Sequence, residues 1–510
     1  MFQHRNIPVQ TGSGVVKTHR PTRRRSTTTM RKTLKLSALA LACSAMMPVA
    51  HATNGYMSHA YSPKAKGMAG AGEAALPQDS LSIVGNPATA NQVGRRADVG
   101  FSWFKPLREY DGLTPNQATG AFAPIGGGAT GTGKVESKNN DFLVPGFGYT
   151  HPINDVSSIG IAMFGNGGMN TDFRSRDTLF NLGTFGGNNP GANPPPFPGT
   201  SMQGAGNAGV NLEQLGVSLA YSRQVAEGLS LGASFLIGYQ TIEVKGVGAF
   251  QGFTETFTQS VLASQMTSAV TPTKLTDNGQ DSAWGFGFQV GGLWDVNPMF
   301  SIGASYRTKM YMGKFEKYAD LFAEGGKFDL PPVGTIGIAV RPNDQLSLAF
   351  DVQQIWYSEV PAIANNNDLA LKCDLNAAFG MPSQPGASYD SRYCLGGSKG
   401  AGFGWDDMTV FKFGAQYAMN DRLTLRAGFS YGDNPISDEQ VAFNTLAPAT
   451  ITTHYTLGAS YLLRDNFEMT FWGMYAPEDS VSGPGEFTGG QAPEIKMHQY
   501  ELGVNFAWLF

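Results

Sequence analysis

The sequence predicts an all-β protein, a transmembrane antiparallel β-barrel of about fourteen strands. Hydrophobic and polar residues alternate over many segments, and the connections between these segments are alternately short and long. Charged residues make up only 15% of the 510 residues, whereas soluble domains carry roughly 25%. Each strand of a membrane barrel has one apolar and one polar face, so the barrel accounts for both the alternation and the low charge.

The N-terminal region is typical of an export signal. Positive residues follow Met30, an apolar run spans residues 34–49, and small residues precede a cleavage point after Ala52. We expect a signal peptide over residues 30–52 and interpret residues 1–29 as an extension from a misassigned start. A short membrane anchor is the alternative, but the run is short for a membrane span.

The final segment has the clearest two-residue period. Its even positions from Tyr500 to Trp508 are aromatic or aliphatic, while its odd positions are mostly polar or small. Alternate side chains of a strand point to opposite faces. The chain ends on Phe510, and a terminal aromatic residue on an amphipathic strand resembles the signal read by the barrel assembly machinery. The predicted strands are residues 97–110, 139–152, 156–166, 212–225, 228–242, 281–296, 298–311, 333–342, 344–358, 407–420, 421–434, 451–464, 465–477 and 496–510.

The connections predict the orientation of this barrel. Every second connection is very short, as at Asn297 and Asn343, and the others are long, as at residues 167–211 and 359–406. Outer-membrane barrels have short periplasmic turns and long extracellular loops. An even strand count therefore places both termini of residues 97–510 on the periplasmic side. A soluble β-sandwich gives no reason for this alternation.

Residues 53–96 do not have the pattern of a membrane strand, since glycines and prolines interrupt them. The lumen of a fourteen-strand barrel is wider than side chains alone fill, because about eight strands already close around a packed interior. We therefore expect these residues to form a hatch, or plug, within the lumen.

This segment resembles a known family. The stretch Gly67–Ala75, followed by Asn86, Pro87 and Ala88, is similar to the hatch of the outer-membrane long-chain fatty acid transporters of the FadL/TodX type. The resemblance extends to residues 165–172 and further stretches toward the aromatic end. It implies a fourteen-strand barrel that takes up hydrophobic substrates through outer loops, an internal apolar pocket and a hatch-gated lateral exit.

Candidate substrate-binding residues are apolar side chains expected in the lumen or in two outer loops. An apolar lining lowers the cost of moving a hydrophobic molecule out of the membrane or water. Packing against the plug, or of loop helices against themselves, is an equal alternative. The candidates are Leu236, Leu293, Trp472, Met474, Met497, Phe250, Phe253, Phe257, Phe322 and Phe328.

Charged residues and cysteines give further expectations. Arg426 or Arg307 could bind a fatty-acid carboxylate, since a guanidinium matches its geometry, although ion pairs and hydrogen bonds between wall and plug are the favoured explanation for charges in the lumen. Cys373 and Cys394 lie in one polar segment and are expected to form a disulfide in an oxidising compartment.

The expected function is uptake of hydrophobic compounds into the cell through the bacterial outer membrane, with long-chain fatty acids first and aromatic or aliphatic hydrocarbons as the alternative. A general porin for small polar solutes is the competing class. Outer-membrane lipid and lipopolysaccharide are expected to surround the barrel. The net charge of -4 indicates no nucleic-acid partner. We find no nucleophile motif, metal cluster or phosphate-binding loop, so neither catalysis nor a cofactor is expected.

Overall fold

The computed structural model describes residues 54–111, 134–174, 207–381, 383, 386–483 and 492–510. The expected extension and signal peptide, residues 1–29 and 30–52, lie outside these ranges. In the part of the chain that is described, no helix is long and apolar enough to cross a membrane.

The described strands form one closed antiparallel sheet of sixteen strands, because the first strand pairs with the last. Two of them, β2 (Val135–Glu136) and β9 (Tyr311–Met312), have two residues each. Fourteen wall strands remain, which confirms the predicted barrel. The wall strands are β1 (Arg96–Asp111), β3 (Phe142–Asn154), β4 (Ser157–Asn170), β5 (Gly209–Ala226), β6 (Leu229–Lys245), β7 (Asp281–Asn297), β8 (Phe300–Arg307), β10 (Val333–Val340), β11 (Leu346–Ile355), β12 (Met408–Ala418), β13 (Leu423–Gly432), β14 (Thr453–Arg464), β15 (Phe467–Ser482) and β16 (Glu494–Leu509).

The two-residue period determines which side chains point outward. On β16, Tyr500, Leu502 and Trp508 are 41%, 57% and 41% exposed, whereas Glu501 and Asn505 between them are buried. Alternation of this kind places the apolar residues toward lipid and the polar residues toward the lumen. The faces predicted for the last strand are therefore confirmed.

Connections of two to five residues join alternate pairs of strands at one end of the barrel. Asparagine side chains build several of these turns: Asn297 Oδ1 accepts hydrogen bonds from the backbone N–H groups of Met299 and Phe300, both at 2.9 Å. Asn343 and Asn420 make equivalent pairs of bonds. Side-chain acceptors of this kind replace backbone acceptors in tight turns.

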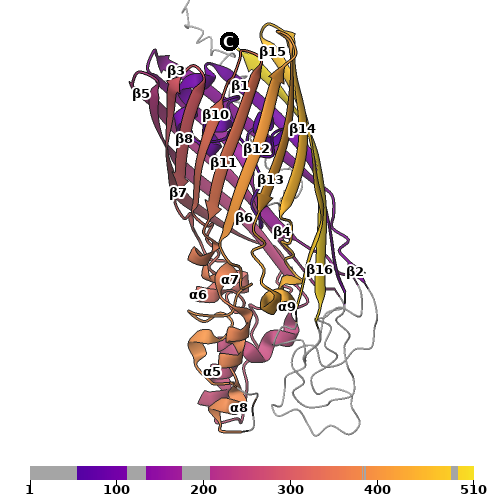
Figure 1. The fold of residues 1–510 in the computed structure, drawn as a ribbon. Helices are drawn as coiled ribbons and strands as arrows, with labels where there is room; N and C mark the ends of the chain where they lie inside the picture. Colours follow the sequence, from indigo (N-terminus) through magenta and orange to yellow (C-terminus); the bar gives the residue numbers. More distant parts are fainter. Residues whose placement is uncertain (1–53, 112–133, 175–206, 382, 384–385, 484–491) are drawn as a thin grey trace, which may run out of the picture. The chain divides into compact units, whose positions relative to one another are not determined.

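The long connections carry short helices, which gather at the end opposite the C-terminus (Figure 1). Thr254 caps the longest of them by accepting a hydrogen bond from Phe257 N at 3.2 Å. These helices are η2 (Gly248–Phe253), α5 (Glu255–Ala263), η3 (Glu316–Tyr318), α6 (Ala323–Gly326), η4 (Tyr357–Glu359), α7 (Pro361–Ala364), η5 (Asn367–Lys372), α8 (Leu375–Ala378), η6 (Ser391–Tyr393), η7 (Asp438–Gln440) and α9 (Val441–Asn444).

One predicted strand, residues 298–311, is divided in the structure. The strand β8 ends at Arg307, and β9 resumes the pairing with β7 further along. The ladder changes at Thr308: its backbone N–H still donates to Phe288 O at 2.9 Å, but Phe288 N donates to the Thr308 hydroxyl, at 3.1 Å, in place of a backbone carbonyl. The alternation of hydrophobic and polar residues in the sequence does not reveal where a side-chain hydrogen bond replaces a backbone one.

Residues 54–94, here called the N-terminal segment, contain α2 (Pro63–Lys66), α3 (Ser82–Gly85), η1 (Pro87–Thr89) and α4 (Ala90–Val93). Most of its side chains are buried, and its indigo ribbon lies between the strands (Figure 1). It forms hydrogen bonds with strands around the circumference of the barrel. The wall residues involved are Gly168 on β4, Gly292 on β7, Asp351 on β11, Thr456 on β14 and Glu468 on β15.

Candidate functional site

An apolar cavity of about 50 Å³, here called the outer pocket, lies where the long loops meet the ends of β5 and β6. None of its lining residues is charged, so a ligand inside it would exchange water for apolar surface. The lining consists of Val210, Val244, Val247, Phe250, Leu321, Phe322, Ala362, Leu395, Ala401, Gly402, Phe403, Phe443 and Leu446.

Backbone hydrogen bonds between two loops hold one side of the outer pocket. Leu395 N donates to Phe253 O at 2.8 Å, and Glu255 N donates to Leu395 O at 2.9 Å. These bonds fix the loop residue Leu395 against the N-terminus of α5, and Leu395 lines the pocket. Burial raises the pKa of Glu255, and nearby Asp320 acts in the same direction.

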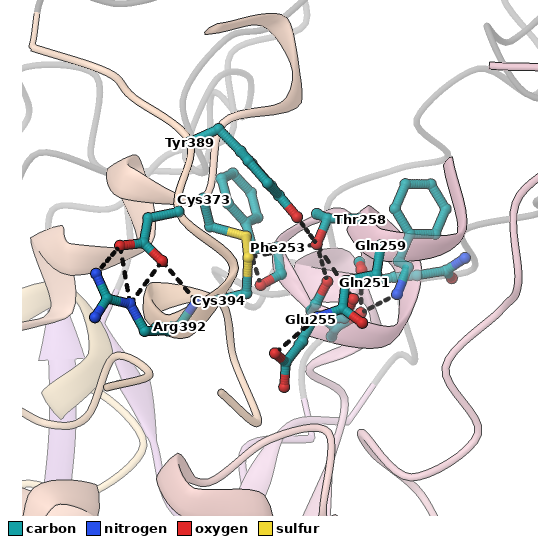
Figure 2. Close-up of a disulfide and its surroundings, with 12 residues drawn as sticks. Gln251, Phe253, Glu255, Thr258, Gln259, Cys373, Tyr389, Arg392 and Cys394 are labelled. Atoms are coloured by element: carbon teal, nitrogen blue, oxygen red, sulfur yellow. Dashed lines mark hydrogen bonds and ion pairs between the residues drawn. A yellow bond between two sulfur atoms is a disulfide. The ribbon is translucent and has the colours of Figure 1, made fainter. Parts of the chain in front are cut away.

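A disulfide joins Cys373 to Cys394, beside α5 (Figure 2). The Cys373 sulfur lies 3.3 Å from Phe253 O, and Thr258 Oγ1 lies 3.4 Å from the Cys394 sulfur. Because Cys394 directly precedes Leu395, the cross-link holds the loop that contributes part of the pocket wall.

The inner side of the outer pocket continues into an aromatic cluster that includes the start of the N-terminal segment. The ring of Tyr56 lies 5.4 Å from Tyr357, 5.9 Å from Trp405 and 6.3 Å from Phe328. Tyr357 also donates a hydrogen bond to Asn54 O at 2.6 Å. Tyr56 belongs to the same apolar core as the pocket residues, and Phe328 lies between its ring and that of the pocket residue Phe322.

Ion pairs fasten the N-terminal segment to the wall. Lys66 Nζ lies 2.5 Å from Glu501 Oε1 on β16, and Lys64 Nζ lies 2.9 Å from Glu468 Oε1 on β15. Asp351 on β11 accepts hydrogen bonds from Gly72 N and Ala74 N at 3.1 and 3.2 Å. A buried charge needs such partners, and removing one partner is costly.

The Asn-Pro-Ala motif docks on the opposite side of the barrel. Asn86 Oδ1 caps η1 by accepting from Ala88 N at 3.0 Å, and its amide nitrogen donates to Ala74 O at 2.8 Å and Gly292 O at 3.0 Å. A side chain on the inward-facing Gly291 would collide with Asn86. The absence of a side chain there lets the motif approach the wall.

A second cavity, of about 30 Å³ and here called the inner cavity, lies between the N-terminal segment and strands β1, β3 and β4. Its lining mixes apolar residues with Lys66 and Trp472. Next to it, the ladder between β4 and β5 shifts register between Gly165 and Gly167. The N-terminal segment bonds to this irregular stretch, since Gly168 N donates to Tyr56 O at 2.9 Å.

The predicted apolar residues fall into several separate environments. Phe250 and Phe322 line the outer pocket, Phe253 packs at the edge of the same core, and Phe328 joins the Tyr56 cluster. The buried face of α5 contains Phe257. All five lie in the long loops.

The predicted lumen residues are buried but do not form one conduit. Leu293 packs against Met68 and neighbouring residues of the N-terminal segment, and Leu236 packs with Met310, Met312 and Leu330. Trp472 lines the inner cavity. Met474 and Met497 belong to a third cluster, here called the β1 cluster, formed by Phe104, Phe142, Val144, Ile451, Met474, Ala476 and Met497.

The two arginines proposed as carboxylate ligands already have polar partners. Arg426 Nε donates to Gln78 at 3.1 Å and to Gln416 at 2.8 Å. Arg307 donates to the Tyr61 hydroxyl at 3.2 Å. Both therefore connect the wall to the N-terminal segment, which agrees with the expectation that charges in the lumen form ion pairs and hydrogen bonds between wall and plug.

Sequence patterns missed two parts of the site. The pocket residues Leu395, Ala401 and Phe403 lie in the glycine-rich loop after β11, whose composition indicates no core. Arg108 was also overlooked, although the parity of β1 places it on the lumen face, where its side chain is buried. Among the described residues, no group of three His, Cys, Asp or Glu side chains could hold a metal ion.

Comparison with known proteins gives relatives over most of the chain. Outer membrane protein P1 of Haemophilus influenzae is 23% identical over 438 residues, 79% of this chain and 81% of that protein. The long-chain fatty acid transport protein of Salmonella typhi is 21% identical over 489 residues, 93% of this chain and 98% of that protein.

Solved structures share the fold. The toluene transporter TodX of P. putida has a TM-score of 0.60 at 16% identity, over 89% of this chain and 99% of TodX. A FadL homologue of Pseudomonas aeruginosa has a TM-score of 0.59 at 16% identity, with the same shares of the two chains covered.

The model of one protein family matches residues 42–186 and 197–481, which is well over half of the 510 residues. The family is described as outer membrane protein transport protein (OMPP1/FadL/TodX). The chain therefore belongs to the OMPP1/FadL/TodX family of outer-membrane proteins of Gram-negative bacteria, which are transport channels for hydrophobic compounds and not enzymes.

Proposed function

We propose that this channel takes up long-chain fatty acids, which it captures in the outer pocket. The observation that carries the proposal is the uncharged lining of the outer pocket among the long loops. Each methylene that leaves water contributes about 0.8 kcal/mol. Each acyl methylene that the outer pocket takes from water adds this amount, before the entropic costs of binding.

In this proposal the long loops face the cell exterior and the short turns face the periplasm, in keeping with the usual arrangement of outer-membrane barrels. The N-terminal segment acts as the hatch. It occupies the space that a general porin keeps open for polar solutes, and its contacts with β4, β7, β11, β14 and β15 support this role. The Asn-Pro-Ala motif would secure one side of it.

Coupling between capture and opening would run through Tyr56. Its ring lies against Tyr357 and Trp405 in the core that continues from the outer pocket. Its carbonyl oxygen accepts the hydrogen bond from Gly168 N, beside the irregular pairing of β4 and β5. A ligand that displaced the ring would disturb this bond. We place the lateral exit at this irregular stretch, which adjoins the inner cavity.

Uptake of aromatic or aliphatic hydrocarbons is the second candidate. It is favoured by the same uncharged lining, since a neutral hydrocarbon needs no polar partner. The toluene transporter TodX shares the fold, and the long-chain fatty acid transport protein of Salmonella typhi is a relative in sequence. Both similarities are compatible with either substrate.

Two further partners belong to the proposal. The barrel assembly machinery would recognise the terminal strand β16 and Phe510, and lipid with lipopolysaccharide would cover the outward aromatic residues such as Trp508. These contacts concern insertion and residence in the membrane, and they apply to either substrate class.

The experiment that tests the function is identification of the compounds that co-purify with the barrel, by mass spectrometry after organic extraction. The proposal predicts bound fatty acids. A chain that purifies with hydrocarbons alone would support the second candidate, and an empty channel with large steady conductance in planar bilayers would support a porin. Deleting residues 53–75 should raise leakage of polar solutes and impair hydrophobic uptake. Unchanged behaviour in both assays would contradict the hatch.

A further inference from the structure

The outward face of strands β10–β13 carries an open apolar notch of about 520 Å³, here called the wall notch. It is about ten times as large as the outer pocket, which has about 50 Å³. It lies on the lipid side of the wall, because Ile338, Leu348 and Phe413 on its rim are exposed. The four strands are consecutive neighbours in the sheet (Figure 1). The lining consists of Ile338, Val340, Leu348, Ala349, Phe350, Phe413, Gly414, Ala415, Ala427, Gly428 and Phe429.

Two small residues in an otherwise bulky surface produce the wall notch. Ala415 on β12 is paired in register with Ala427 on β13, and both lie on the outward face. One row nearer the long loops, three aromatic rings stand side by side: the ring centre of Phe413 lies 4.8 Å from that of Phe350 and 6.5 Å from that of Phe429. The two alanines therefore leave a hollow that the aromatic row closes on the side of the long loops.

The floor of the wall notch is backbone, and the N-terminal segment supports it from inside the barrel. Gly414 and Gly428 line the floor, and a Cβ atom added to either of them would collide with Met68 of the N-terminal segment. The wall cannot bend inward to close the hollow, since Met68 is packed directly behind it. The wall notch is therefore a fixed feature of the surface, and only a group from the membrane can fill it.

Charged residues of both signs lie in the short turns at the end of the same strands. Arg422 precedes β13 by one residue and lies five residues from Ala427, which corresponds to about 16 Å along a strand. Arg464 ends β14, the next strand. Asp421 and Asp465 adjoin the two arginines, and all four side chains are exposed. Within the described ranges, neither guanidinium takes part in an ion pair.

We propose that the wall notch binds one acyl chain of a zwitterionic glycerophospholipid, from the leaflet on the side of the short turns. The phosphate lies at Arg422 and Arg464, since a guanidinium matches the geometry of a phosphate. The ammonium group lies at Asp421 and Asp465. The about 16 Å from Arg422 to Ala427 is close to half of the roughly 30 Å hydrocarbon core, so the chain reaches the notch from a head group at the surface. This lipid site is separate from transport and holds for either cargo.

A second copy of the chain is the competing occupant of the wall notch. Leu457 on β14 is paired in register with Ala427 and is 70% exposed, so it would insert into the notch of a partner. Small residues at an interface allow such close packing within a membrane. A second copy would fill the hollow without using the arginines of the turns, whereas a phospholipid needs both. Dependence on the head group therefore separates the two occupants.

The test is native mass spectrometry of the full barrel, delipidated in detergent and titrated with dioleoylphosphatidylethanolamine or with dioleoylglycerol, which has the same chains but no phosphate. We expect the wild type to bind one phospholipid saturably. Ala427→Phe fills the notch and should weaken the binding of both lipids about five-fold or more, which corresponds to the loss of roughly ten close carbon–carbon contacts. Arg422→Gln should weaken phospholipid binding about five-fold, close to what one basic residue contributes at an anionic membrane surface, and leave dioleoylglycerol binding unchanged.

The matched controls are Ala233→Phe, at an exposed position of β6, and Arg223→Gln, at an exposed position near the short-turn end of β5. Both should leave the binding of the two lipids unchanged. If either control weakened binding as much as its counterpart, lipid would coat the wall without a specific site, and the inference would be overturned. A wild-type barrel without a saturable phospholipid adduct would overturn it too. A dimer that Ala427→Phe converts to monomers, with lipid binding unaffected, would assign the notch to a second copy instead.

Discussion

The side-chain amide of Asn86 donates a hydrogen bond to the carbonyl oxygen of Gly292 on β7, at 3.0 Å, across a separation of 206 residues. The same nitrogen bonds to Ala74 O within the N-terminal segment. Asn86 thus joins two parts of the segment to one point on the wall. Its neighbours on β7, Gly291 and Gly292, face opposite sides of the sheet, so they provide a matched pair of substitutions.

We predict that Gly291→Ala loosens the N-terminal segment, whereas Gly292→Ala does not. A Cβ atom on Gly291 would collide with Asn86, but one on Gly292 would meet Leu231 Cδ2 at an ordinary 3.5 Å. Overpacking of this kind costs about 1–3 kcal/mol. Gly291→Ala should admit small polar antibiotics into cells, measured as a lower inhibitory concentration. Equal sensitivity of the two variants would contradict the docking geometry.

The ion pair between Lys66 and Glu501 should be needed for stability. Neutralising Glu501 alone, in Glu501→Gln, leaves Lys66 buried without its carboxylate partner, which costs roughly 3–5 kcal/mol. We expect a lower temperature for the loss of the compact barrel band in unboiled gel samples. The double variant Lys66→Met/Glu501→Gln should recover most of the loss. If the double variant were less stable than the single variant, the pair would not be the cause.

Reducing the disulfide should loosen the outer loops and leave the wall intact. The cross-link between Cys373 and Cys394 encloses a sequence separation of 21 residues, and chain entropy gives about 3 kcal/mol for a loop of this order. Cys373→Ser/Cys394→Ser should be cleaved faster by trypsin between residues 356 and 407, while the melting of the barrel stays unchanged. Wild-type protein under reducing conditions should behave in the same way. Identical cleavage rates with and without the bond would contradict its role in holding the pocket loop.

Capture should depend on the apolar lining of the outer pocket. Phe250 lines it and packs edge-on against Phe443, with ring centres 4.9 Å apart. Phe250→Gln should raise the KM for fatty-acid uptake roughly ten-fold, since a buried Phe contributes about 1.5–3 kcal/mol. Phe250→Leu should retain most of the affinity. The control is Val270→Gln, at a position 55% exposed in the same connection. An equal effect at Val270 would mean that the outer pocket is not the capture site.

The wall could be predicted from sequence because its signal is local. A strand such as β16 shows its outward face in the alternation from Tyr500 to Trp508, and turns such as that at Asn297 follow from a side chain that bonds two or three residues away. The division of residues 298–311 was missed, because it depends on a side-chain hydrogen bond between Thr308 and Phe288 on a neighbouring strand.

The binding surfaces depend on contacts between distant residues, so sequence gave only part of them. Phe250 was a candidate on hydrophobicity alone, but its pocket also needs Leu395 and Phe403, from a loop that looks polar. Arg108 could have been placed in the lumen from the parity of β1. Among the described residues its Nε has no hydrogen-bond acceptor, whereas Arg307 and Arg426 bond to several side chains, and the sequence does not show this difference.

The decisive measurement is uptake of a radiolabelled long-chain fatty acid by cells that lack their own transporter and express either this chain or an empty vector. We expect saturable uptake that requires the chain, is impaired by deletion of residues 53–75, and occurs without increased entry of polar solutes in cells with the intact chain. Uptake equal to that of the empty vector, or entry of polar solutes in place of the fatty acid, would contradict it.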